Sequence, residues 1–134
     1  MKKYLALLIS FLALSLLVSG ASAAQNQNTA THPVIKTKLV KVDKEFQVVL
    51  KSNPTTGYSW MAKFDPKYIQ LVNSKYVPYK TSNNIVGSGG VQIFTFKAIK
   101  KGFSRITFEY QRPWAETVPP IKVETYNIFA FKWF

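Results

Sequence analysis

Residues 45–64 read EFQVVLKSNPTTGYSWMAKF, which combines two strand patterns with a short polar loop. Apolar residues at alternate positions from Phe46 to Leu50 are typical of a strand with one face buried. After the loop comes a short aromatic run, Tyr58 to Phe64, in which we expect Trp60 to be a core residue. The stretch therefore predicts two strands joined by a tight connection.

The connection at 53–58 is stiff by composition. Pro54 fixes its own φ, removes one backbone donor and biases Asn53 toward extended geometry. Gly57 permits the positive φ that a sharp turn requires, and the two threonines between them have restricted rotamers. A rigid polar loop loses little entropy on docking, so this stretch is either an ordinary strand connection or a preorganised binding element.

Further strand patterns of similar length occur along the rest of the chain. No convincing amphipathic helix occurs after the N-terminal segment. The alternation is cleanest at 103–110, with Ile106, Phe108 and Tyr110 on one face. Residues 68–79 form either one bulged strand, which we favour, or a small hairpin. Aromatic residues occur on both faces of the last run. Strands are expected at 34–39, 46–51, 58–64, 68–79, 91–99, 103–110 and 123–134.

These short strands predict an all-β fold, an immunoglobulin-like antiparallel β-sandwich of about seven strands. If the strands reverse direction at every step, the connections after the second, fourth and sixth strands lie at one end. Those connections are residues 52–58, 80–90 and 111–120. A hairpin within 68–79 would move the first of them to the opposite end.

The second and third connections carry residues suited to binding. The second ends in the glycine-rich quartet 87–90, whose mobile backbone another chain can approach closely. A strand pattern follows it instead of a helix start, which excludes a phosphate-binding loop. In the third, Trp114 is either a core residue or, as we favour, an exposed interface anchor. Arg112 offers a planar donor fork for carboxylates or for ring stacking.

The first 23 residues have the layout of a secretory signal peptide. Two lysines precede a mostly apolar stretch, and Ala21-Ser22-Ala23 offers a small-x-small cleavage site. We therefore expect a signal peptide (1–23), a flexible leader (24–33) and one folded domain (34–134); a retained N-terminal anchor is the alternative. Export predicts a secreted or periplasmic protein, or a vesicular one in a eukaryote, without stable membrane insertion after cleavage.

The composition leaves little from which to build an active site. There is no Cys, six acidic residues show no paired spacing, and the single histidine, His32, lies in the leader. We therefore predict no enzyme, no cofactor and no metal site, and stability that comes from packing instead of disulfides. The formal charge of +12 comes mostly from scattered lysines, which either solvate the surface or steer the protein toward an acidic partner.

Three motifs fall in the three predicted loops. They are Asn53-Pro54-Thr55-Thr56-Gly57-Tyr58, Gly87-Ser88-Gly89-Gly90 and Arg112-Pro113-Trp114. In this order on a β-sandwich, they resemble the chagasin family of cysteine peptidase inhibitors. Each motif alone is a weak signal, whereas three in order at suitable spacing are a strong one. The likeness extends from Val34 to Phe134, nearly the whole chain after the leader.

The resemblance implies a monomeric, reversible and non-covalent inhibitor of papain-like cysteine peptidases. It implies that Pro54 to Gly57 sit in the active-site cleft, near the peptidase's catalytic cysteine and histidine. The glycine motif would lie along one wall of the cleft and Arg112 to Trp114 along the other, with Ser88 as the variable position. A peptidase is then the partner, and nucleic acid is not. The alternative is an exported module that binds an envelope or polyanion, whose binding should weaken steeply with salt.

Overall fold

The computed structural model describes residues 33–80 and 87–133, which contain seven β-strands and one short 3-10 helix. The predicted signal peptide, nearly all of the predicted leader with His32, and residues 81–86 of the second loop lie outside the described residues. Within the described ranges, no helix has the length and apolarity that crossing a membrane requires.

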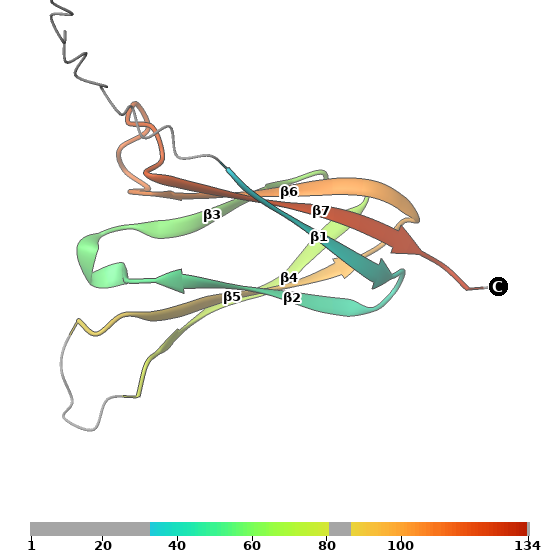
Figure 1. Cartoon of the computed structure of the whole chain (residues 1–134), viewed down its shortest axis with the longest axis horizontal. Helices are drawn as coiled ribbons and strands as arrows, with labels where there is room; N and C mark the ends of the chain where they lie inside the picture. Colours follow the sequence, from blue (N-terminus) through green and yellow to red (C-terminus); the bar gives the residue numbers. More distant parts are fainter. Residues whose placement is uncertain (1–32, 81–86, 134) are drawn as a thin grey trace, which may run out of the picture.

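Two sheets face each other and form a sandwich (Figure 1). The strands are β1 (Val34–Lys41), β2 (Glu45–Ser52), β3 (Ser59–Phe64), β4 (Ile69–Pro78), β5 (Gly90–Ala98), β6 (Gly102–Gln111) and β7 (Lys122–Phe131). The four-stranded sheet has the order β1-β7-β6-β3, and the three-stranded sheet has the order β2-β5-β4. The predicted immunoglobulin-like sandwich of seven strands is confirmed.

One strand pair departs from the antiparallel prediction, since β1 pairs with β7 in parallel. All other pairs are antiparallel. The physical reason is the alternation of direction: the first and the seventh strand of an alternating series run the same way. When these two become neighbours in one sheet, their pairing must be parallel.

The core lies between the two sheets and is rich in aromatic rings. The most completely buried large side chains, Phe96 and Phe108, meet edge to face with ring centroids 6.0 Å apart. Trp60 is only 2% exposed, as the sequence predicts. Within the described ranges, every residue of the buried cluster falls between Val40 and Ile128.

Two ambiguities of the sequence are resolved by the strand pairing. Residues of the predicted run 68–79 form one strand, β4, whose register against β5 shifts between Leu71 and Asn73, so the favoured bulged strand is confirmed. In β7, Tyr126 and Ile128 are buried whereas Phe129 is 43% exposed. The aromatic residues near the end of β7 therefore lie on the outer face of the sheet.

Candidate functional site

The described parts of the connections after β2, β4 and β6 lie at the end of the sandwich away from the C-terminus (Figure 1). We call residues 53–58 the tip loop, the described residues 79–80 and 87–89 the glycine loop, and residues 112–121 the tryptophan loop. Gly90, which the sequence places in the second loop, is already the first residue of β5. Because β4 is one strand and not a hairpin, all three loops fall at the same end, as the sequence predicts.

The tip loop is closed by its own hydrogen bonds. Residues Pro54–Thr56 form a 3-10 turn, and the Gly57 N–H donates to the Pro54 carbonyl at 2.9 Å. The Thr56 hydroxyl donates to the Asn53 carbonyl at 2.7 Å, and the Thr55 hydroxyl donates to Asn53 Oδ1 at 2.6 Å. Gly57 has a φ of 80°, a conformation that favours glycine. The loop therefore has a defined shape before it meets any partner.

Tyr110, at the end of β6, fixes the tip loop to the core. Its hydroxyl accepts a hydrogen bond from the Asn53 backbone N–H at 2.9 Å. Its ring packs on Trp60 at a centroid distance of 4.9 Å, and the Trp60 indole N–H donates to the Lys51 carbonyl at 2.8 Å. Sequence reasoning placed Tyr110 on the inward face but missed the role of its hydroxyl. The sequence signal for this role is that Tyr110, whose ring carries a polar hydroxyl, stands at the loop end of an otherwise apolar strand face.

A hydrogen bond joins the tip loop to the glycine loop. The Asn53 side-chain amide donates to the Gly87 carbonyl at 3.2 Å. Both Gly87 and Gly89 have positive φ, of 91° and 75°. The Tyr79 N–H donates to the Gly89 carbonyl at 3.0 Å and so closes the base of the loop. Asn53 therefore acts as a hub: its side chain and backbone contact the glycine loop, Tyr110 and both threonines.

The tryptophan loop packs against the other side of the tip loop. A Cβ placed on Gly57 would lie only 2.8 Å from Cη2 of Trp114, so the glycine lets the indole edge approach the backbone. The Arg112 guanidinium lies 4.8 Å from the ring centroid of Tyr58, which is a cation–π distance. Trp114 is nevertheless 70% exposed, so the alternative of a core tryptophan is wrong.

Exposure divides the sequence-predicted site residues into two groups. The exposed residues are Pro54, Thr55, Thr56, Gly87, Ser88, Arg112, Pro113 and Trp114. The half-buried residues Asn53, Gly57, Tyr58 and Gly89 lie beneath them. Gly90 is buried, and a side chain there would collide with the Val77 carbonyl oxygen. Position 90 therefore needs a glycine because the packing leaves no room for a side chain. The structure brings the other predicted residues together at one surface.

The two groups with clear pKa shifts, Lys36 and Glu124, lie on β1 and β7 and belong to none of the three loops. Burial of the Glu124 carboxylate opposes its ionisation, but hydrogen bonds from Lys122 and Lys36 outweigh burial, so the pKa of Glu124 lies below its usual value. The hydrogen bond from Lys36 to Glu124, at 3.0 Å, and a second to the Tyr126 hydroxyl raise the pKa of Lys36. These groups stabilise the packing of β1 on β7.

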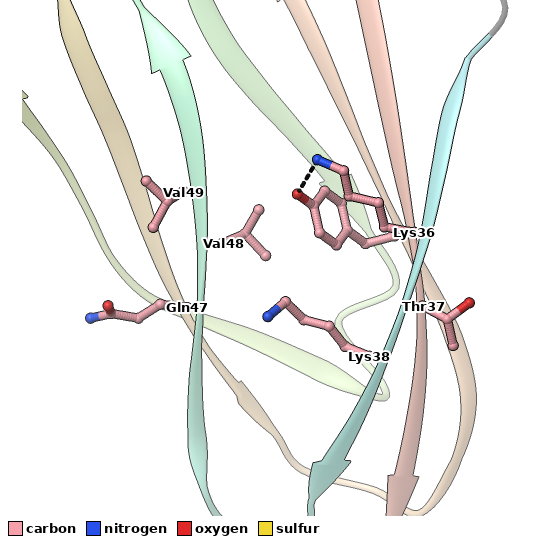
Figure 2. Close-up of a pocket in the computed structure, with 7 residues that line it drawn as sticks. Lys36, Thr37, Lys38, Gln47, Val48 and Val49 are labelled. Atoms are coloured by element: carbon pink, nitrogen blue, oxygen red, sulfur yellow. Dashed lines mark hydrogen bonds between the residues drawn. The ribbon is translucent and has the colours of Figure 1, made fainter.

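A pocket of about 390 Å³ opens between the edge strands β1 and β2. Figure 2 shows Lys36 and Lys38 extending from β1 toward β2, and the Val48 side chain extending from β2 toward them. None of the sequence-predicted site residues lines this pocket. Among residues 33–80 and 87–133, no group of three or more His, Cys, Asp or Glu side chains is arranged to hold a metal ion.

Residues 39–128 match the model of a family described as chagasin family peptidase inhibitor I42. Among known proteins, Amoebiasin-2 of Entamoeba histolytica is 24% identical over 123 residues, which cover 88% of this chain and 95% of that protein. Chagasin of Trypanosoma cruzi is 30% identical over 98 residues, which cover 69% of this chain and 86% of Chagasin.

Solved structures share the fold. The crystal structure of a cysteine protease inhibitor from Entamoeba histolytica aligns with a TM-score of 0.65 at 22% identity, over 76% of this chain and 91% of that one. The structure of Leishmania mexicana ICP aligns with a TM-score of 0.53 at 27% identity, over 74% of this chain and 88% of that one.

Proposed function

The chain belongs to the chagasin family of peptidase inhibitors, and from this premise we propose that it inhibits papain-like cysteine peptidases by closing their active-site cleft with three loops. As a member of that family it is an inhibitor and not an enzyme. The observation that carries the three-loop proposal is that the tip loop touches both of its neighbours, through Asn53 and Gly87 on one side and through Gly57 and Trp114 on the other.

The tip loop is the part that enters the cleft. Pro54, Thr55 and Thr56 are its exposed residues, and none carries a group that could react with a catalytic cysteine. Inhibition is therefore reversible occlusion: the loop fills the space that a substrate would occupy. Its internal hydrogen bonds hold the backbone in one shape, so it does not adapt to the near-attack geometry, about 3–3.5 Å between aligned reacting atoms, that acyl transfer requires.

Preorganisation is the physical source of affinity. Ordering a rotamer-rich side chain on binding costs about 0.5–1.5 kcal/mol. Here both threonine hydroxyls are already hydrogen-bonded to Asn53, and Arg112 already lies over Tyr58. Much of that cost is therefore met on folding, before the peptidase is encountered.

The two outer loops provide the walls of the contact. Trp114 is a rigid, exposed aromatic side chain, and tryptophan and arginine are enriched among residues that dominate interface energies. On the other side, Gly87 and Ser88 expose backbone that a peptidase surface can approach closely. Three such loops are consistent with burying roughly 800 Å² per partner, the usual size of a protease–inhibitor interface.

Export is a further part of the proposal. The basic start, apolar stretch and small-x-small site of residues 1–23 support removal of a signal peptide and release of residues 24–134 outside the cytoplasm. A chain without cysteine suits such a compartment, because its packing does not depend on the redox state.

The test is to lengthen the tip loop and measure inhibition of papain. Two alanines inserted between Thr55 and Thr56 should abolish inhibition, because they break the closed shape that fits the cleft. The matched control places the same insertion between Lys100 and Lys101, in the β5–β6 connection. That protein should inhibit like the parent. Both variants must retain β-type circular dichroism, and full inhibition by the tip-loop variant would refute insertion of this loop.

A further inference from the structure

A cluster of large apolar side chains lies on the outer face of the four-stranded sheet. It consists of Leu39, Phe103, Phe129, Phe131 and Trp133, which we call the aromatic patch. Their exposed fractions run from 38% for Phe131 to 76% for Leu39. Large exposed apolar patches on a monomeric protein usually mark a surface that meets another molecule or a membrane.

The patch is continuous across three strands. Leu39 on β1 and Phe103 on β6 both lie opposite Phe129 on β7. The rings of Phe103 and Phe129 are 5.1 Å apart, and those of Phe131 and Trp133 are 5.5 Å apart. Phe129 and Phe131 alternate with the half-buried Ala130, so both point outward. The five side chains thus form one surface and not scattered exposures.

The patch lies at the opposite end of the sandwich from the three loops. It occupies the end of β1, the start of β6 and the end of β7, whereas the tryptophan loop joins the other ends of β6 and β7 (Figure 1). The occlusion of a peptidase by the loops therefore neither uses nor covers it. The packing of the core does not require it either, because an outward side chain contributes nothing between the sheets.

Basic side chains border the patch. Lys41 is the cross-strand neighbour of Phe131, and the Arg105 guanidinium lies 6.0 Å from the Phe103 ring centroid. Neither takes part in the three ion pairs found among the described residues. Among the described residues of this sheet, the one acidic residue on the outward face is Glu109, which lies toward the loop end and pairs with Lys63.

We propose that the aromatic patch docks the protein on an anionic phospholipid bilayer. Aromatic side chains favour the membrane–water interface, and basic side chains beside them are attracted to anionic headgroups. The whole chain's formal charge of +12 falls only to +10 when Lys2 and Lys3 are removed with residues 1–23, and this charge favours the same partner over a neutral or basic surface. Docked in this way, the sandwich would hold its three loops away from the bilayer, where a peptidase could reach them.

The test is vesicle sedimentation of residues 24–134, which contain all seven described strands and the described core cluster but lack the apolar N-terminal stretch. Phosphatidylcholine vesicles with phosphatidylglycerol should bind the protein, and vesicles of phosphatidylcholine alone should bind it much less. The double variant Phe129→Thr/Trp133→Thr should lower the partition coefficient by about tenfold or more, because it removes two interfacial aromatic side chains. The control Val49→Thr/Met61→Thr, which changes apolar residues 51% and 42% exposed elsewhere, should not.

A second variant keeps the test independent of the folding of the first. Lys41→Gln/Arg105→Gln should weaken binding to the anionic vesicles roughly tenfold or more, since each basic residue near such a surface contributes several-fold. Unchanged inhibition of papain and unchanged circular dichroism would show that the variants are folded. No sedimentation with anionic vesicles, equal binding to both vesicle types, or binding unaffected by the patch variants would overturn the proposal. A concentration-dependent dimer in ultracentrifugation, lost in the double variant and without vesicle binding, would assign the patch to a second copy instead.

Discussion

Replacing Gly57 with alanine tests whether the tip loop and Trp114 act as one unit. A Cβ on Gly57 would lie 2.8 Å from Cη2 and 3.1 Å from Cζ2 of Trp114. Carbon atoms in optimal contact are about 3.5–4.0 Å apart, so the indole would have to move by roughly 0.7 Å or more. Because Trp114 is 70% exposed, we expect the ring to swing outward while the core stays intact.

The expected magnitudes follow from two separate effects. Alanine at a φ of 80° costs about 1 kcal/mol of folding free energy, which lowers Tm by about 4–8 °C in a domain of this size. Displacing Trp114 from its preorganised position adds about 0.5–1.5 kcal/mol to the cost of binding. The inhibition constant for papain should therefore rise roughly 2- to 12-fold.

Gly102→Ala separates the two effects. Gly102 also has a positive φ, of 127°, but a Cβ there would meet the Tyr68 ring at an ordinary 3.5 Å, and the residue lies at the opposite end of the sandwich. It should lose similar stability and inhibit normally. In a Trp114→Ala background, Gly57→Ala should cause no further loss of inhibition. If Gly57→Ala loses stability but inhibits fully, or if its effect adds fully to that of Trp114→Ala, the coupling between the two loops is refuted.

Three further substitutions test the interface role of Trp114, the hydrogen bond to the Tyr110 hydroxyl and the ionic role of Glu124. Trp114→Ala should weaken papain inhibition by about 2 kcal/mol or more, roughly 30-fold, with little change in Tm, and a collapse of thermal stability would contradict an interface role. Tyr110→Phe should lower the free energy of unfolding in urea by about 1–2 kcal/mol, because the Asn53 N–H loses its acceptor, and should weaken inhibition several-fold. Glu124→Gln should lower stability by about 1 kcal/mol at pH 7. Since the folded-state pKa of Glu124 lies below its ordinary 4.5, that difference should be present above pH 4.5 and vanish as the pH falls through the folded-state pKa; equal loss at all pH values would argue against an ionic role.

Alternation along each strand carries most of the fold information in the sequence. Phe94 and Phe96 in β5, and Ile106 and Phe108 in β6, predict their inward faces because polar or smaller residues separate them. The pattern fails in β7, where Phe129 and Phe131 satisfy the same apolar criterion as the buried Tyr126 and Ile128. Only the pairing with β1 and β6 decides which set faces the core, and pairing is a non-local property.

The candidate site was predictable in its residues but not in its contacts. Proline, glycine and tryptophan mark the loops in the sequence. Strands that reverse direction at every step place these loops at the same end. The contact of Gly57 with the edge of Trp114 depends on how two loops far apart in sequence approach each other. The Tyr110 hydroxyl was hidden for the same reason, since its acceptor role requires knowing that the Asn53 N–H lies beside it.

The most direct test of the central claim is a titration of active papain with residues 24–134, followed with a fluorogenic peptide substrate at low and at high salt. Cleft occlusion by the three loops predicts a reversible, competitive loss of activity with one inhibitor per enzyme, weakened only modestly by salt, because most of the contact is steric and apolar. A folded domain that leaves papain fully active, or whose inhibition disappears at high salt as polyanion binding does, would contradict cleft occlusion by the three loops.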